Sequence, residues 1–174
     1  SRIYLKRQLT PSDIVEGFRA LPSANVADAM YRLNSLDSRI RRLGPSLSSP
    51  MAGVALTARV TAGDNLMLHK ALDLAKPGDV ILVSNGGVDT QALMGEVMFG
   101  YAKFRGVAGL VFDGPVRDVD SLPGLGLPVF ATGLRPGGPL KNGPGELNVP
   151  IACGGVCINP GDVILADNDG VVVI

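Results

Sequence analysis

An arginine and an aspartate stand side by side just beyond a continuous apolar run. The run covers residues 107–112, and Arg117 and Asp118 follow it after a short segment that contains glycine and proline. Such a run predicts a buried strand, and ligand sites of α/β proteins gather beyond the carboxyl ends of strands. A guanidinium matches a carboxylate with two hydrogen bonds, and an aspartate oxygen suits Mg²⁺ or Mn²⁺. The pair therefore indicates a site for an acidic substrate and a metal, with a structural ion pair or a turn cap as the alternative.

A glycine before a predicted helix forms a second candidate. Gly95 precedes residues 96–105, which are expected to be helical, so Glu96, Val97 and Met98 lie in the first turn. The N–H groups of a first turn lack intrahelical partners, and the helix dipole favours an anion there. Glu96 would add a carboxylate beside this anion site. Glycine before a helix is common, so the pattern alone does not establish a site.

The chain has one histidine, His69, which lies in a helix predicted over residues 65–75. Asn65 stands four residues earlier and shares a helix face with it. The two side chains could form a polar wall of a substrate site. The alternative is a histidine hydrogen-bonded in the interior.

Several catalytic motifs are absent from the sequence. It contains no nucleophile elbow of the GxSxG type, no phosphate-binding P-loop and no dinucleotide glycine fingerprint. None of its five lysines falls within an apolar strand, where burial could lower a lysine pKa for Schiff-base chemistry. An enzyme acting on a carbonyl group would therefore depend on a metal.

The composition limits the partners and the compartment. Sixteen basic residues balance sixteen acidic ones, so no basic excess exists for binding nucleic acid. The N-terminal residues lack the apolar stretch of a signal peptide, and no segment reaches the ~20 apolar residues of a membrane span. Cys153 and Cys157 are expected to be reduced thiols. These features predict a cytoplasmic protein with no membrane partner.

The predicted elements describe one α/β domain over residues 1–174, with helical structure in residues 1–22. Two similar turns, around Pro77-Gly78 and Pro160-Gly161, each precede an apolar run, and proline-glycine fits the centre of a type II turn. Alternating strands and helices between these turns predict parallel pairing, followed by a β-rich end. The predicted helices cover residues 11–21, 23–33, 65–75, 96–105 and 119–122, and the predicted strands cover residues 51–61, 80–83, 88–94, 107–112 and 128–131.

At these residues the sequence resembles the family of the regulator of ribonuclease activity A, which includes the 4-hydroxy-4-methyl-2-oxoglutarate and 4-carboxy-4-hydroxy-2-oxoadipate aldolases. The segment from Arg105 to Asp118 is the most specific part of the resemblance. Shorter matches occur around Asp64-Asn65, Gly95-Glu96 and Asp167-Asn168-Asp169, and the resemblance extends from about Ser23 onward.

The resemblance implies a three-layer β/β/α fold of the swivelling type, with a parallel central sheet and a smaller β-rich layer. It also implies a homotrimer or a pair of trimers with sites between subunits. The implied activity is a class II aldolase that cleaves a 4-hydroxy-2-oxo dicarboxylate to pyruvate through an enolate, and that could also decarboxylate oxaloacetate. Asp118 would hold Mg²⁺ or Mn²⁺, Arg117 would bind the small 2-oxo acid substrate and stabilise its enolate, and the N–H groups of residues 95–98 would hold the carboxylate.

Two departures from the family bear on activity. The aldolases carry aspartate where Glu96 stands, as a contact to a metal-bound water and a candidate base. They also have a longer C-terminal region with an acidic residue for the neighbouring site, which is expected to be absent here. Some relatives without the full acidic set are non-enzymatic regulators that bind ribonuclease E, and this is the alternative function.

Overall fold

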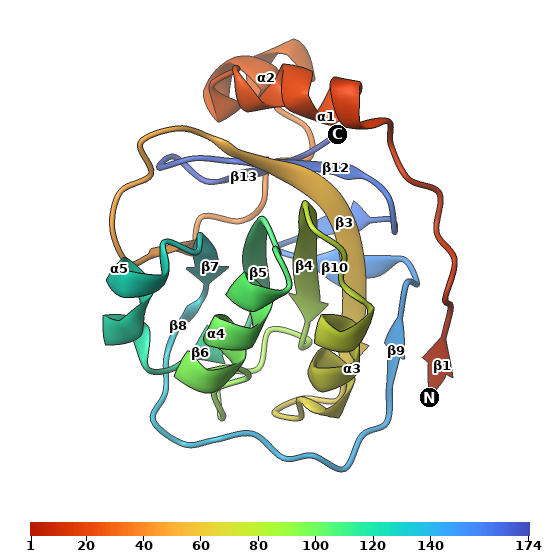
Figure 1. Ribbon diagram of the computed structural model, residues 1–174, viewed down its shortest axis with the longest axis vertical. Coiled ribbons are helices and arrows are strands. Elements are labelled where there is room, and N and C mark those ends of the chain that lie inside the picture. Colours follow the sequence, from red (N-terminus) through yellow and green to blue (C-terminus); the bar gives the residue numbers. More distant parts are fainter.

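The computed structural model describes residues 1–174 and is built around one large mixed sheet (Figure 1). Its strands follow the order β1-β9-β3-β4-β5-β7-β2. The neighbours β3, β4, β5 and β7 are all parallel, whereas β9, β12 and β2 join this centre in antiparallel fashion. The strands of the path are β1 (Arg2–Ile3), β9 (Gly145–Leu147), β3 (Met51–Val60), β4 (Asp79–Ser84), β5 (Gly109–Asp113), β7 (Val129–Ala131) and β2 (Arg41–Leu43). The predicted parallel centre is therefore confirmed within a mixed sheet.

Helices cover one face of this sheet. Figure 1 shows α3 (Leu66–Leu74) and α4 (Glu96–Phe104) lying over the central strands. Leu68 of α3 and Phe99 of α4 are fully buried, and they belong to one core cluster with Ile81 of β4 and Phe112 of β5. The 3₁₀ turn η1 (Val119–Ser121) and the short helix α5 (Leu122–Leu125) follow at the side of this layer.

A second β layer covers the opposite face. It consists of the separate hairpin of β10 (Ile151–Cys153) and β11 (Val156–Ile158) together with β12 (Val163–Ala166) and β13 (Val171–Val173), which extend the main sheet from the first residues of β3. Leu82 and Val111 of the central strands share a core cluster with Ile151 and Cys153 of the hairpin. The two cores on either side of the sheet confirm the three-layer β/β/α fold. None of the helices combines the length and the apolar character needed to cross a membrane.

Both thiols are free, as predicted, although they differ in surroundings. Cys153 is buried and Cys157 is exposed. Burial, together with the nearby Asp113 carboxylate, raises the pKa of Cys153 to about 12. Cys153 therefore stays protonated and behaves as a core residue.

Each proline-glycine turn has the predicted conformation. The φ angles of Gly78 and Gly161 are 87° and 98°, which a type II turn requires and glycine accepts. An aspartate fixes each turn through a backbone N–H, because Asp79 Oδ2 accepts from Lys76 at 2.8 Å and Asp162 Oδ2 accepts from Asn159 at 2.7 Å.

Three details of the sequence prediction are wrong. The helix predicted over residues 23–33 is α2 (Ser23–Ala29), because Tyr31, Arg32 and Asn34 have positive φ angles that end it. The helix predicted over residues 11–21 is the shorter α1 (Ser12–Arg19), and the Thr10 hydroxyl before it donates to the Gly161 carbonyl. Residues 88–94 form an irregular segment rather than a strand.

The carboxylate of Asp167 holds α2 against the second β layer. It accepts hydrogen bonds from the Ser23 N–H at 2.8 Å and the Ser23 hydroxyl at 2.6 Å, and also from the Asp169 N–H. Partial burial opposes ionisation of this carboxyl, but the hydrogen bonds from Ser23, Asp169 and Gly170 outweigh it and lower its pKa. The negative charge also lies at the positive end of the α2 dipole.

Replacing Asp167 by asparagine is expected to lower the free energy of unfolding at pH 7 by about 1 kcal/mol, since charged hydrogen-bond acceptors are lost. A carboxyl whose pKa is lower in the folded state stabilises the fold above its ordinary value of 3.8, and this stabilisation disappears as the pH falls through the folded value. Urea unfolding at pH 7 and pH 3 measures the difference between the two proteins, which should shrink at pH 3. The exposed neighbour Asp169→Asn is the control, and equal effects of both substitutions would contradict the prediction.

Candidate active site

A pocket of about 290 Å³ opens beside Arg117 and Asp118, where β5 and the short strand β6 (Pro115–Val116) end. Seven of the eight residues singled out in the sequence line this pocket. The lining residues are Asn65, His69, Met94, Gly95, Val97, Met98, Arg117, Asp118, Pro139 and Lys141. The chain thus brings together candidates from three separate parts of the sequence, as the rule for strand ends predicts.

Arg117 and Asp118 face this pocket without being sealed against each other. Arg117 Nε lies 3.6 Å from Asp118 Oδ2, and the two side chains are 42% and 47% exposed. The Arg117 guanidinium also donates to the Pro136 carbonyl at 3.2 Å. Asp118 has a left-handed backbone, with φ at 58°, and the Ser121 hydroxyl donates to its carbonyl at 2.7 Å. Both charged groups therefore remain accessible to a ligand.

The start of α4 forms the wall next to this pair. The Glu96 N–H donates to Asp118 Oδ2 at 3.2 Å, and the Met98 N–H donates to the Gly95 carbonyl at 3.0 Å. The N–H groups of Gly95 and Val97 have no partner within the protein. These two donors stand at the positive end of the helix, where an anionic group is favoured.

Glu96 takes a different place from its neighbours. It is exposed, and its side chain does not contribute to the wall of the pocket. Only its N–H contacts the central pair, through Asp118. The carboxylate of Glu96 therefore stands at the rim of the site.

Asn65 and His69 differ in the way they meet the pocket. His69 is exposed on α3, so the alternative of an interior histidine is wrong. Asn65 is only 2% exposed, and its Nδ2 donates to the Leu93 carbonyl at 3.0 Å and approaches Met98 Sδ at 3.4 Å. The amide of Asn65 is thus engaged within the protein.

Sequence reasoning missed Lys141, which adds a cation to the pocket wall together with the neighbouring Pro139. The glycine- and proline-rich segment that carries them has no periodic pattern. It is fixed by long-range backbone bonds, from the Leu140 N–H to the Gly63 carbonyl and from the Asn65 N–H to the Leu140 carbonyl. No signal in the sequence indicates that the segment with Pro139 and Lys141 lies next to the site.

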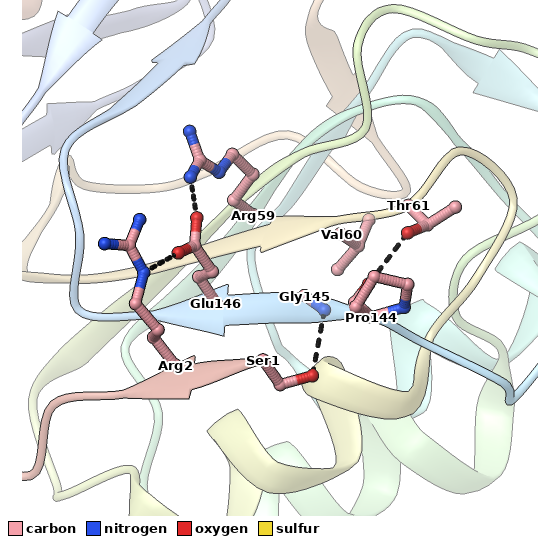
Figure 2. Close-up of a pocket in the computed structure, with 8 residues that line it drawn as sticks. All are labelled: Ser1, Arg2, Arg59, Val60, Thr61, Pro144, Gly145 and Glu146. Atoms are coloured by element: carbon pink, nitrogen blue, oxygen red, sulfur yellow. Dashed lines mark hydrogen bonds and ion pairs between the residues drawn. The ribbon is translucent and has the colours of Figure 1, made fainter.

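A larger hollow of about 430 Å³ lies elsewhere, along the edge formed by β1, β9 and the end of β3. Figure 2 shows that Arg2 and Arg59 both point toward the Glu146 carboxylate, with which they form ion pairs. The Glu146 carboxylate, the one acidic side chain that lines this hollow, is therefore already neutralised by two arginines. The smaller pocket at Arg117 and Asp118 is the better candidate for chemistry.

The donor set at this pocket fits magnesium or manganese better than zinc. No group of three histidine, cysteine or acidic side chains converges anywhere in the protein. Zinc sites use three or four such ligands, whereas Mg²⁺ binds through one or two carboxylates and keeps several waters. The half-exposed carboxylate of Asp118 and the open space before it suit the second arrangement.

The fold and the site together define a three-layer α/β protein with an open pocket, lined by Arg117 and Asp118, near the ends of its parallel strands. The chain belongs to the RraA-like family, because the family model described as "RraA-like: Aldolase/RraA" matches residues 23–173. This confirms the family resemblance inferred from the segment that ends at Asp118.

The relatives include a protein named as an aldolase and proteins described as inhibitors of ribonuclease or RNA processing. A protein of Halalkalibacterium halodurans named "Putative 4-hydroxy-4-methyl-2-oxoglutarate aldolase" is 42% identical over 162 residues, which cover 93% of this chain and 76% of that protein. The crystal structure of Streptomyces coelicolor RraAS2, described as an unusual member of the RNase ES inhibitor RraA family, matches with a TM-score of 0.86 and 29% identity, over 97% of this chain and 87% of that one. The RNA-processing inhibitor RraA from Thermus thermophilis matches with a TM-score of 0.79 and 30% identity, over 88% of this chain and 92% of that one.

Proposed function

We propose that this protein is a divalent-metal-dependent aldolase that cleaves a 4-hydroxy-2-oxo dicarboxylate of the 4-hydroxy-4-methyl-2-oxoglutarate or 4-carboxy-4-hydroxy-2-oxoadipate type to pyruvate. The observation that carries this proposal is the shared open pocket of Arg117, Asp118 and the unpaired N–H groups at the start of α4. The name of the 42% identical relative supports the same class of reaction.

The hydrogen-bond donors of the pocket would bind the two ends of a dicarboxylate. The carboxylate next to the 2-oxo group would accept hydrogen bonds from the N–H groups of Gly95 and Val97, with the guanidinium of Arg117 beside it. Lys141 and His69 line the same pocket and would face the more distant carboxylate. This division of roles selects a substrate with acidic groups at both ends.

Asp118 would hold Mg²⁺ or Mn²⁺ through its carboxylate. When bound, such a cation supplies a Lewis acid that draws electron density toward the 2-oxo group. The Glu96 N–H that now contacts Asp118 Oδ2 keeps this carboxylate turned toward the start of α4.

The cleavage step moves one electron pair and one proton. The 4-hydroxyl would pass its proton to the Glu96 carboxylate as the bond between C3 and C4 breaks, so C4 becomes a carbonyl group. The electron pair passes into the 2-oxo group, and Arg117 stabilises the resulting enolate charge with its guanidinium. Protonation of C3 then gives pyruvate. Loss of carbon dioxide from oxaloacetate generates the same enolate, so the pocket would also support that reaction.

The direct test is a pyruvate-release assay with several 4-hydroxy-2-oxo dicarboxylates and with oxaloacetate. Turnover that stops with a chelator and returns with Mg²⁺ or Mn²⁺ is the expected result. Equal turnover before and after chelation would refute the metal dependence, and the absence of turnover on every substrate would refute the aldolase.

Glu96 is proposed as the acid–base group at the rim of the pocket. Glu96→Gln is expected to lower kcat by about 100-fold, since a positioned acid–base group contributes at least that factor. Glu96→Asp keeps the charge and should stay within a few-fold of the unchanged protein. Steady-state kinetics on the preferred substrate provide the comparison, and unchanged kcat in Glu96→Gln would assign the proton transfer to water.

A homotrimer or hexamer is proposed on the basis of an exposed apolar face of α4. Val97 and Phe104 are 87% and 82% exposed, and Phe104 stacks on the half-exposed Tyr101. Val97 also lines the pocket, so a second copy packed on this face would lie against the site. Light scattering should give three or six times 18.0 kDa, and Phe104→Glu should give the monomer mass. A monomeric unchanged protein would contradict this proposal.

The second candidate function is regulation of ribonuclease E without catalysis. It is favoured by the two structural relatives that are named as inhibitors of ribonuclease or RNA processing. This function requires binding that is independent of metal and of Asp118. A pull-down with ribonuclease E in the presence of chelator tests it, and no retention at low salt would count against it.

A further inference from the structure

Asn65 lies beneath the pocket, where it connects three segments of the wall. Its Nδ2 donates to the Leu93 carbonyl at 3.0 Å and approaches Met98 Sδ at 3.4 Å. Its N–H donates to the Leu140 carbonyl at 2.9 Å. One side chain and its own backbone therefore link the segment before α4, the first turn of α4 and the segment that carries Lys141.

The Leu93 carbonyl stands two residues before Gly95, whose N–H faces the site. Leu93 is fully buried, and its own N–H donates to the Pro115 carbonyl at 2.9 Å. The next carbonyl, that of Met94, accepts from the Arg117 N–H at 3.0 Å. The orientation of the peptide groups that lead to Gly95 is thus set by Asn65 on one side and by the strand before Arg117 on the other.

The other polar atom of the Asn65 amide, Oδ1, shows whether Asn65 positions the main chain or contacts a substrate directly. Oδ1 is buried and has no hydrogen-bond partner in the protein. An unpaired buried acceptor is unfavourable, so an apolar side chain would pack here at lower cost if the donor were not needed. Because Oδ1 has no exposed surface, it does not reach a ligand in the pocket. The contribution of Asn65 therefore comes from its Nδ2 donor.

We infer that Asn65 is a positioning residue that holds residues 93–98 so that the N–H groups of Gly95 and Val97 stay directed at the carboxylate of the bound acid. Its effect on turnover rests on the proposed aldolase function, whereas its effect on the main chain does not. Loss of the Nδ2 donor would leave the Leu93 carbonyl unpaired and free the start of α4 to rotate.

A matched pair of substitutions tests this inference. Asn65→Asp replaces the donor with an acceptor of the same shape, which repels the Leu93 carbonyl. Asn148→Asp makes the same change far from the pocket, because Asn148 Nδ2 also donates to a carbonyl, that of Tyr4, and its Oδ1 is also unpartnered. Asn148 is less buried than Asn65, so Asn148→Asp should lose less stability, and the comparison therefore uses the site amides and the ligand affinities.

Asn65→Asp should shift the amide resonances of Gly95 and Val97 in the absence of any ligand, whereas Asn148→Asp should leave them in place. In calorimetry with Mg²⁺ present, the Kd of oxalate, a planar analogue of the pyruvate enolate, should rise about tenfold in Asn65→Asp only, as expected for loss of one good hydrogen bond. The affinity for Mn²⁺ alone should change less than the affinity for oxalate, because the Asp118 carboxylate is kept and only the Glu96 N–H that contacts it would move. A purely structural role would weaken metal and oxalate binding together.

Unchanged amide resonances in Asn65→Asp would overturn the inference, as would an equal loss of oxalate affinity in both variants. If Asn65→Asp does not fold, Asn65→Ala and Asn148→Ala provide the same comparison without an added charge. If the amides move in the Asn65 variant while the unchanged protein releases no pyruvate, the proposed function fails and the positioning role stands. The two ideas can therefore fail separately.

Discussion

Replacing Asp118 by asparagine is expected to lower the rate of pyruvate release by about a thousandfold, which corresponds to ~4 kcal/mol of lost transition-state stabilisation. The amide keeps the shape of the side chain but removes the charge that a divalent cation requires. Asparagine also accepts the left-handed backbone found at this position, where φ is 58°, so the loop should fold as before. The substitution thus removes the metal ligand with little change to the fold.

Two measurements separate loss of metal from loss of structure. Mn²⁺ binding followed by electron paramagnetic resonance should weaken in parallel with turnover, while the thermal unfolding midpoint stays near that of the unchanged protein. Asp120→Asn is the matched control, because this exposed carboxylate lies two residues further along the same turn. Full turnover by Asp118→Asn, or an equal loss in Asp120→Asn, would show that Asp118 is not the metal ligand.

The part of the site that could be predicted from sequence is the part that local rules govern. Arg117 and Asp118 follow an apolar strand, and a strand that ends at a sheet edge must present the next residues there. Gly95 marks the start of a helix whose first-turn N–H groups are unpaired by geometry. The two proline-glycine turns could also be predicted from the sequence, because only glycine accepts their positive φ angles without strain.

The rest depends on contacts between segments far apart in the chain. Residues 88–94 carry apolar side chains and were predicted as a strand, yet they pair irregularly, with the Ala92 N–H donating to the Gly137 carbonyl and the Leu93 N–H to the Pro115 carbonyl. Only residues 92–94 are buried, so a short apolar segment takes the place of the expected strand. Lys141 enters the pocket on a segment without any periodicity, so its position follows only from the closed fold.

The same distinction applies to Asn65, whose partners could not be predicted from the sequence. Helical spacing predicted a polar wall of Asn65 and His69, and both residues line the pocket, although Asn65 is the residue that precedes α3. Spacing says nothing of the Leu93 carbonyl, which lies 28 residues away and takes the Asn65 donor. A buried polar residue next to a site must therefore be interpreted from its partners.

Gly95→Ala is expected to lower turnover by about 100-fold without unfolding the protein, since small displacements of reacting groups cost that much. The backbone of Gly95 has φ at −145° and ψ at −170°, which alanine adopts freely. The obstacle is space: an added Cβ would lie 2.3 Å from Asp118 Oδ2 and 3.0 Å from Arg117 Cγ. Both side chains are half-exposed, so they can swing aside into solvent, and by doing so they would leave the positions that the proposed reaction needs.

Gly100→Ala provides the matched control within the same helix. Nothing lies within 4 Å of a Cβ built on Gly100, and alanine is favoured over glycine in a helix interior, so this variant should keep full turnover and gain about 0.5–1 kcal/mol in stability. Steady-state kinetics and urea unfolding of both variants give the comparison. Because Gly95 and Gly100 differ in what surrounds them and not in the residue introduced, a selective loss of turnover at Gly95 would locate the chemistry at Arg117 and Asp118. Normal turnover by a stable Gly95→Ala variant would exclude those two side chains from the reaction.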